Sequence, residues 1–260
     1  MPQAPDHNLT SSSFIELQSV DSTNNYARAL IHDNLAQHGS AIFAHEQVQG
    51  KGQRGKIWIS EKDANIILSI LLKPAPLQLL EQFQLSACIA VAVHDFFKKY
   101  AGNDTKIKWP NDLYWQDRKA GGILIETVVR SAGSGASSWT WVIVGIGINI
   151  NQTSFSAQLP NPVSLKQITN KDFKTVLLAK ELHAIVEKYF RELITEGFEY
   201  IYSKYVFNLY QKESTVRLKK DNRVFEATIK TVSPAGKLVV QHTIEEEFDF
   251  GEVEWLINQS

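Results

Sequence analysis

Hydrophobic residues change their spacing several times along the chain, and each spacing predicts a different element. Short apolar or alternating runs predict strands at residues 14–17, 40–46, 65–72, 106–109, 113–115, 122–129 and 139–150. Helical spacing predicts four helices. The first follows the N-cap residues Ser22-Thr23-Asn24, and the other three cover 77–100, 172–190 and 198–209. A Gly/Ser-rich stretch, 131–138, predicts a hairpin loop between two of the strands.

The pattern changes near Ser214, where short strands and turn residues take over. Strands are predicted at 216–218, 225–232, 238–241 and 247–250. The chain therefore predicts an α+β fold: a mixed, mainly antiparallel sheet with helices on one side, followed by a small β-barrel. The expected organisation is a disordered lead-in (1–13), a catalytic domain (14–212) and a C-terminal barrel (213–260).

Composition narrows the class of protein. Of 260 residues 43% are hydrophobic, and 27 cations against 28 acidic residues give a net charge of -1, which does not favour DNA or an anionic membrane as the main partner. The single cysteine, Cys88, excludes a disulfide within the chain. The N-terminus is too polar for a signal peptide, and the longest apolar run, 66–72, is far shorter than a membrane span, so a cytoplasmic protein is expected.

Residues 47–56 are the most distinctive segment. The glycines formally match G-x-G-x-x-G, but a dinucleotide fingerprint must open a helix, and residues 57–60 do not predict one. This disfavours a Rossmann nucleotide-binding protein, and a P-loop would need a Gly-Lys-Ser/Thr ending that is missing. Three cations (Lys51, Arg54, Lys56) and no acidic residue predict a flexible loop that wraps an anion, with a solvated surface loop as the ordinary alternative.

Three further segments place polar residues or glycines at predicted strand ends. Pro110 forces an extended residue before it and a turn after it, so Asn111 and Asp112 lie at a tip. Residues 117–122 lead two cations into a glycine pair, which suits close approach of a ligand. Residues 145–151 form an apolar strand with two glycines. Singly, these segments have ordinary alternatives: a turn, a hairpin with exposed charges, and a buried strand with a bulge.

Together and in this order, the segments resemble the biotin–protein ligase family. The matching strings are Ser22-Thr23-Asn24, Gln47 with Gly50-Lys51-Gly52-Gln53-Arg54-Gly55, Lys108-Trp109-Pro110-Asn111-Asp112, Arg118-Lys119 with Gly122-Ile123-Leu124 and Glu126, and Gly145 to Asn149. The resemblance covers roughly residues 14–257 and implies a class II synthetase-like catalytic domain with an SH3-like barrel. Some relatives carry a DNA-binding domain before the catalytic domain. Because this chain begins at the catalytic domain, we expect neither that domain nor specific DNA binding.

The resemblance implies two half-reactions in one site. Biotin and ATP with Mg²⁺ form biotinyl-5'-AMP and pyrophosphate, and a lysine of a biotin carboxyl carrier protein, an acyl-CoA carboxylase subunit, then takes the biotin. Fixed cations suit this chemistry, because two anions must be brought together. A homodimer is compatible with the resemblance, and no metal ligands are assigned.

The same resemblance implies roles for individual residues. Lys119 would contact the biotin carboxylate and the α-phosphate, and Asp112 would orient or deprotonate the incoming lysine. The expected biotin-binding residues are Ser22, Thr23, Asn24, Gln47, Gly50, Lys51, Gln53, Lys119 and Gly122. The expected ATP-binding residues are Lys51, Arg54, Lys56, Trp58, Asn111, Lys119 and Asn149.

One position departs from the family pattern, since some relatives carry Arg where this chain has Gln53. Two alternatives stay open at this point. A lipoate–protein ligase shares the fold and also adenylates a small acid, and a biotin-responsive regulatory protein belongs to another functional class.

Overall fold

The computed structural model describes residues 13–131, 137–157, 159 and 161–256. The expected lead-in (1–13) and the expected loop (131–138) therefore lie outside the described residues, except for residue 13 and residues 131, 137 and 138. Among the described residues, no helix combines the length and apolarity needed to span a bilayer.

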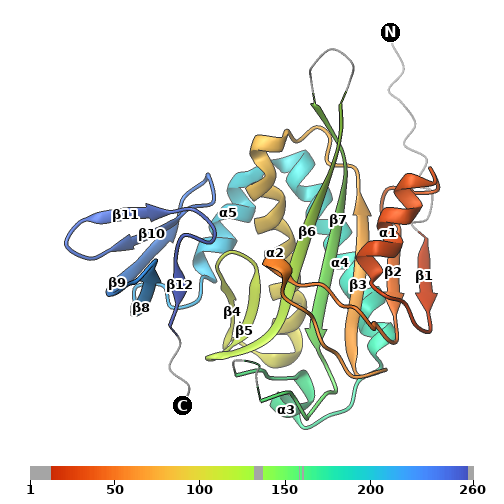
Figure 1. The fold of residues 1–260 in the computed structure, drawn as a ribbon, viewed down its shortest axis with the longest axis horizontal. Helices are drawn as coiled ribbons and strands as arrows, with labels where there is room; N and C mark the ends of the chain where they lie inside the picture. The colour runs from red at the N-terminus through yellow and green to blue at the C-terminus, as the bar shows by residue number, and fades with distance from the viewer. Residues whose placement is uncertain (1–12, 132–136, 158, 160, 257–260) are drawn as a thin grey trace.

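A seven-stranded sheet forms the centre of the molecule (Figure 1). Its strands, in sheet order, are β1 (Phe14–Leu17), β2 (Ala41–Ala44), β3 (Asn65–Leu72), β7 (Ser137–Asn149), β6 (Arg118–Ser131), β5 (Asp112–Trp115) and β4 (Thr105–Lys108). Only the β1–β2 pair among these is parallel. The sheet is therefore mixed and mainly antiparallel, as predicted.

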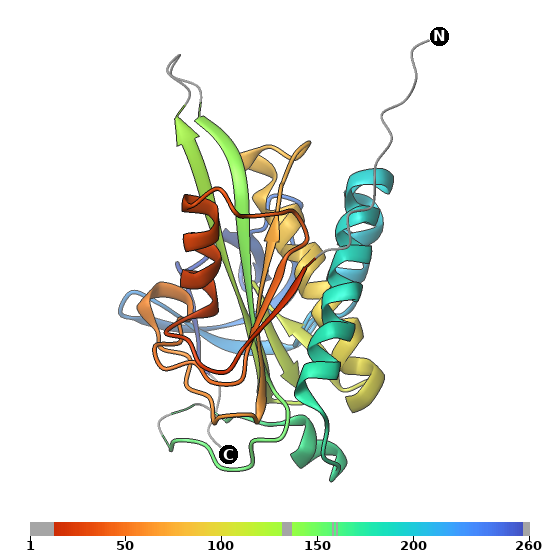
Figure 2. The ribbon, with the colours of Figure 1, turned by 90° about the vertical axis from the view of Figure 1, so that its right-hand side faces the viewer.

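Helices cover both faces of this sheet (Figure 2). The long helices α2 (Gln82–Ala101) and α4 (Thr175–Glu196) pack on one face, and α5 (Phe198–Phe207) lies beside α2. The first helix, α1 (Thr23–His32), packs Ala27 and Ile31 on the opposite face, against Leu71 of β3. All eight residues of β3 are buried because both of its faces are covered. The prediction of helices on one side thus holds for the long helices, while α1 occupies the other side.

The C-terminal strands form a second, five-stranded antiparallel sheet. Its order is β11 (Glu245–Phe248), β10 (Leu238–Gln241), β9 (Arg223–Val232), β8 (Thr215–Lys220) and β12 (Glu254–Trp255). It fits the predicted SH3-like module, and its apolar residues join the main core. Trp109 connects the two sheets by donating its indole N–H to Gly236 O at 2.9 Å. The boundary at 212/213 falls between α5 and β8 and stays a prediction.

Some predicted element ends differ from the observed ones. The helix expected from residue 77 begins at Gln82, because Glu81 accepts a hydrogen bond from the Gln78 backbone at 2.8 Å and closes a 3₁₀ turn, η2 (Leu79–Glu81). The helix expected at 172–190 instead spans Thr175–Glu196 and stops at Gly197, whose φ is 88°. The short α3 (Leu165–Thr169) was not predicted.

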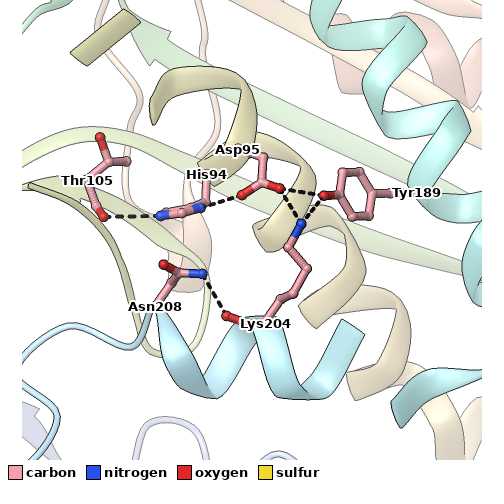
Figure 3. A network of polar contacts seen from close by, with 6 residues as sticks. All are labelled: His94, Asp95, Thr105, Tyr189, Lys204 and Asn208. Carbon is pink, nitrogen blue, oxygen red and sulfur yellow. Dashed lines mark hydrogen bonds and ion pairs between the residues drawn. The ribbon is translucent and has the colours of Figure 1, made fainter. Parts of the chain in front are cut away.

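A polar network joins α2, α4 and α5 (Figure 3). Asp95 accepts hydrogen bonds from Lys204 at 2.5 Å and from the Tyr189 hydroxyl, and it contacts His94 Nδ1 at 2.8 Å. The other ring nitrogen of His94 lies 3.1 Å from Thr105 O. Although burial acts to raise it, these hydrogen bonds hold the pKa of Asp95 well below its ordinary value. The network links the three helices, because each of them supplies at least one of its polar side chains.

Candidate active site

A cavity of about 720 Å³ opens between the main sheet, residues 47–59 and the C-terminal sheet. Fourteen of the fifteen site residues expected from the sequence line it. These are Ser22, Thr23, Asn24, Gln47, Lys51, Gln53, Arg54, Lys56, Trp58, Asn111, Asp112, Lys119, Gly122 and Asn149. The fold therefore brings together residues that are separated by more than one hundred positions in the sequence.

One end of the cavity is built from uncharged polar groups at the start of α1. Thr23 donates its backbone N–H to Gln47 Oε1 at 2.9 Å. Ser69, fully buried in β3, lies 2.8 Å from Thr23 Oγ1 and 2.5 Å from Asn24 Oδ1. Ser22, Thr23 and Asn24 are each less than 5% exposed. These groups form a preorganised polar end suited to an uncharged ring that carries both donors and acceptors.

The orientation of the Asn24 amide is fixed by a charged pair. Asn24 Nδ2 donates to Glu126 Oε2 at 2.7 Å, and Arg28 binds the other oxygen of the same carboxylate at 2.8 Å. The nitrogen of Asn24 is thus committed to Glu126, and its Oδ1 faces Ser69. Glu126 belongs to the same matching string as Lys119, so two strings distant in the sequence together orient the Asn24 side chain.

The Gly-rich segment folds back on itself as a small closed loop. Trp58 N–H donates to Gly50 O at 2.9 Å and Gly52 N–H donates to Lys56 O at 2.7 Å. A Cβ at Gly50 would lie 2.1 Å from Trp58 O and 2.5 Å from Gln47 Nε2, so only glycine fits there. Gly50, expected to bind biotin, does not line the cavity and instead allows this close turn.

Two residues of the loop contact other parts of the chain. Arg54 donates to Gly251 O at 3.3 Å and lies over the Phe250 ring, with its guanidinium carbon 5.7 Å from the ring centroid. Gln53 donates to Ile123 O at 3.4 Å. The loop thus bridges the main sheet and the segment that leads into β12.

The Pro-Asn-Asp turn is held by two hydrogen bonds, one to β6 and one from α5. Asn111, only 4% exposed, donates its amide to Ile123 O at 2.6 Å. The buried Tyr205 of α5 donates its hydroxyl to Pro110 O at 2.8 Å. Asn111 lies in the turn between β4 and β5, as predicted, and its side chain is a buried part of the cavity wall. Asn149 is likewise buried and donates to Val163 O at 3.1 Å.

Asp112 and Lys119 form the ion pair at the centre of the cavity. Lys119 Nζ lies 2.6 Å from Asp112 Oδ1, and both side chains keep about a quarter to a third of their surface exposed, 26% and 30%. Lys119 is the second residue of β6, which begins directly after the turn at residues 116–117. Gly122, paired with Asp112 across the strands, lies directly beside this pair, since a Cβ at this position would lie 3.3 Å from Asp112 Oδ1 and 3.5 Å from Lys119 Nζ. A partly exposed ammonium next to a carboxylate can serve both anion binding and proton transfer.

Two residues of this region had no predicted role: Ser69, and Lys108, which belongs to one of the matching strings but had no expected contact. Ser69 is the one polar residue in the apolar run 66–72, and such an exception inside a buried strand was the available signal. Lys108 lines the cavity, and burial lowers its pKa to about 8, with Lys119 and Lys56 acting in the same direction and Asp112 against it.

The described residues hold no group of three or more His, Cys, Asp or Glu side chains that could bind a metal ion. Of the carboxylates in the cavity, Asp112 pairs with Lys119, and Asp117 accepts from the Tyr210 hydroxyl at 2.7 Å. Such a site fits a Mg²⁺ ion that is carried by substrate phosphates better than one held in a protein cage.

The chain that forms this cavity is similar in sequence to a known protein family. Residues 16–149 match the model of the biotin/lipoate A/B protein ligase family. The bifunctional ligase/repressor BirA of Escherichia coli K12 is 37% identical over 120 residues, which cover 45% of this chain and 36% of that protein. A biotin–[acetyl-CoA-carboxylase] ligase of Paracoccus denitrificans is 36% identical over 122 residues, 46% of this chain and 47% of that one. The matched regions thus span a third to a half of these relatives.

Solved structures share the fold over nearly the whole chain. A biotin protein ligase of Aquifex aeolicus in complex with biotin and ATP superposes with a TM-score of 0.76 at 22% identity, covering 95% of this chain and 99% of that one. A biotin protein ligase of Leishmania major in complex with biotinyl-5-AMP gives 0.60 at 19% identity, covering 91% and 98%. Since the family model matches more than half of the described sequence, including both the loop and the ion pair, the chain belongs to the biotin/lipoate A/B protein ligase family.

Proposed function

We propose that the protein activates biotin with ATP to biotinyl-5'-AMP and then transfers the biotin to a lysine of a carrier protein. The observation that carries this proposal is the polarity of the cavity. Neutral amides and hydroxyls gather at the α1 end, while Lys119 lies next to Asp112 further along the sheet. One molecule with a neutral ring and a carboxylate tail would satisfy both ends.

The first half-reaction begins with positioning. The Asn24 and Thr23 side chains would hold the ureido ring of biotin, with Asn24 oriented by Glu126. Lys119 would hold the carboxylate against the α-phosphate, which reduces the repulsion between the two anions. The carboxylate oxygen attacks the α-phosphorus, the bond to the β-phosphate oxygen breaks, and pyrophosphate leaves with the electron pair. Mg²⁺ would arrive with ATP as part of that substrate.

The second half-reaction needs a base. The incoming lysine must lose a proton before its amine can attack the acyl carbon of the adenylate. Asp112 is the carboxylate closest to Lys119 and would accept that proton or orient the amine, while AMP leaves. Trp58 would cover the adenine, and Lys51, Arg54 and Lys56 would surround the phosphates. The carrier protein, a homodimer, the absence of specific DNA binding and a cytoplasmic location all stay predictions.

The test compares two acids. Purified protein with Mg-ATP should exchange labelled pyrophosphate into ATP when biotin is added, and it should biotinylate one lysine of a carboxyl carrier domain. Exchange driven by lipoate and not by biotin would replace this proposal with a lipoate–protein ligase.

A further inference from the structure

Lys108 occupies a corner of the cavity to which no role is yet given. It is the last residue of β4, the strand at the edge of the main sheet. Its ammonium lies 5.4 Å from the centroid of the Tyr114 ring and 5.1 Å from that of the Trp255 ring. Since Trp255 belongs to β12, Lys108 lies where the main sheet meets the C-terminal sheet.

The ammonium of Lys108 has no oxygen partner among the described residues. Three other cavity cations do: Lys119 binds Asp112 at 2.6 Å, Lys51 binds Asn25 Oδ1 at 2.5 Å, and Arg54 contacts Gly251 O. Asp112 is the nearest candidate for Lys108, but its Oδ1 is already held by Lys119. Two aromatic faces compensate a cation only in part, since a cation–π contact contributes about 0.5–2 kcal/mol.

Other donors without acceptors lie in the same cavity. The indole N–H of Trp255, whose ring contacts the Lys108 ammonium, is buried and has no hydrogen-bond partner in the described part of the chain. The buried indole N–H of Trp58, over β7, is unpaired there as well. Lys56 and Lys119 add positive charge close enough to Lys108 to lower its pKa. This side of the cavity therefore has more donors and cations than acceptors, which suits a ligand rich in anionic oxygens.

The order of residues across the sheet gives that ligand a direction. The polar end contacts β3, Lys119 lies on β6, Asp112 on β5 and Lys108 on β4, and the sheet order runs β3, β7, β6, β5, β4. Lys108 pairs with Asp112 across the strands, and Asp112 pairs with Gly122. In phosphoryl-type transfer the attacking and leaving oxygens lie roughly in line. An acid that approaches from the β3 side must expel its leaving group toward β4.

We propose that Lys108 binds the β- and γ-phosphates of ATP and stabilises them as they leave as pyrophosphate. This rests on the proposed function, because it needs an adenylation step. The Pα–O bond that breaks leaves its electron pair on the pyrophosphate, and the ammonium of Lys108 meets the negative charge that develops there. No proton transfer is required for the step to balance.

Proton uptake should accompany binding of the phosphates. With the pKa of Lys108 at about 8 in the empty cavity, the amine is largely neutral at higher pH. A bound polyanion raises that pKa toward or above its ordinary value, so binding takes up a proton between about pH 8 and 10 and little below pH 7. Asp112, Lys119 and Lys56 act on the pKa of Lys108. The Tyr114 ring lies beneath its ammonium, with Tyr210 and Asp117 close to Tyr114, and all of these groups are retained when Lys108 alone is replaced.

The experiment measures binding of inorganic pyrophosphate to Lys108→Met by calorimetry in two buffers with different ionisation enthalpies. The variant should bind pyrophosphate about 10- to 100-fold more weakly, as expected for a lost charge-assisted hydrogen bond, and should lose the extra proton uptake. Protons released or taken up by pyrophosphate itself are common to both proteins and cancel in the difference. The KM for ATP should rise by a similar factor, with biotin affinity within about twofold. Lys108→Arg, charged at all these pH values, should bind pyrophosphate without the loss of affinity above pH 8.

Lys106→Met is the matched control, since Lys106 lies two residues away on the same face of β4 but does not line the cavity. It should bind pyrophosphate like the wild type. Equal pyrophosphate affinity and equal proton uptake in wild type and Lys108→Met would overturn the inference. If the wild-type protein forms no adenylate with biotin while the Lys108 effect on pyrophosphate persists, the proposed function has failed and the anion site has not.

Discussion

The indole of Trp58 lies directly over the backbone of Gly147. A Cβ at position 147 would come within 2.5 Å of Trp58 Cε2 and 2.9 Å of its Nε1. Because position 147 of β7 is glycine, the Trp58 indole can lie against the strand inside the cavity. This contact explains one of the two glycines that the sequence analysis noted in this strand.

Gly147→Ala should displace Trp58 and weaken ATP binding. We expect the KM for ATP to rise about tenfold, because the stacking of one aromatic ring contributes about 1–3 kcal/mol. If the effect acts through the indole, Gly147→Ala combined with Trp58→Ala should be no worse than Trp58→Ala alone. Additive losses in steady-state ATP kinetics would show that Gly147 acts elsewhere.

Lys119→Ala should fold normally and lose adenylation by about 10²- to 10³-fold in kcat, as for other preorganised charges at a reacting centre. Arg118→Ala should lose far less rate, because Arg118 donates to Pro162 O at 2.6 Å and so serves the local backbone. Single-turnover adenylate formation measures both variants. Near wild-type adenylation by Lys119→Ala would move the role to Lys51 or Arg54.

Hydrogen exchange should slow across residues 47–56 when biotin and ATP are added. The loop is already closed on itself by two backbone hydrogen bonds, and one side chain, Arg54, makes its contact with the C-terminal segment, through a 3.3 Å hydrogen bond to Gly251 O and its position over the Phe250 ring. That contact can open and close at little energetic expense, so the loop is suited to act as a lid. Amides of β8 and β9 serve as the reference, and unchanged exchange in the loop would exclude a lid.

The sequence predicted elements well where one residue pattern decides them. Strand 65–72 was predicted with its observed bounds, because an apolar run flanked by turns is buried on both faces. The face of the sheet on which α1 packs was not predicted, since an amphipathic pattern shows that a helix packs but not on which face. The start of α2 differs from the prediction because a local capping interaction closes a 3₁₀ turn before Gln82.

The sequence predicted which residues belong to the site, but it did not predict how their side chains contact one another. The ordered motifs selected side chains that the fold gathers into one cavity. Their partners depend on strand register and helix placement, which set the Ser69 contact with Asn24 and the contact of Lys108 with Trp255. Neither contact has a local signal, because each joins residues more than forty positions apart in the sequence.

Asp95→Asn should lower stability at neutral pH by about 1–3 kcal/mol, since the lost carboxylate leaves Lys204 without its charge partner. The pKa of Asp95 is lower in the folded than in the unfolded protein, so its contribution is present above the ordinary value of 3.8 and disappears as the pH falls below it. Thermal unfolding measured between pH 3 and 7 should therefore show a Tm that falls less steeply at acid pH in the variant than in the wild type.

The control for Asp95 is Glu192→Gln, which breaks a 3.6 Å pair with the largely exposed Lys188. An exposed pair contributes little, so this variant should unfold within about 0.5 kcal/mol of the wild type at every pH. Equal losses in the two variants would mean that the network in Figure 3 is no stronger than a surface ion pair.

Lys108→Met should stabilise the empty protein at pH 7. A lysine whose pKa is lowered on folding is charged there at a penalty, which is relieved only as the pH rises from about 8 toward its ordinary value of 10.5. The side chain is partly exposed and its ammonium contacts two rings, so we expect a gain of only about 1 kcal/mol. Denaturant unfolding at pH 7 and pH 10 should show the gain shrinking with pH, and a less stable variant at pH 7 would contradict the assignment.

Ser69→Ala should weaken biotin binding without weakening ATP binding. The Ser69 hydroxyl has one proton and Asn24 Oδ1 can only accept, so Ser69 donates to Asn24, whose nitrogen is held by Glu126. Removing the hydroxyl leaves that buried oxygen without a partner, and we expect the Kd for biotin to rise about tenfold by titration calorimetry. Ser40→Ala removes another buried hydroxyl, at the start of β2, whose partner is Ser13, and should bind biotin like the wild type. If both variants bind biotin equally well, Ser69 supports only the fold; if ATP binding falls in parallel with biotin binding, the cavity as a whole has shifted and the α1 end has no separate role.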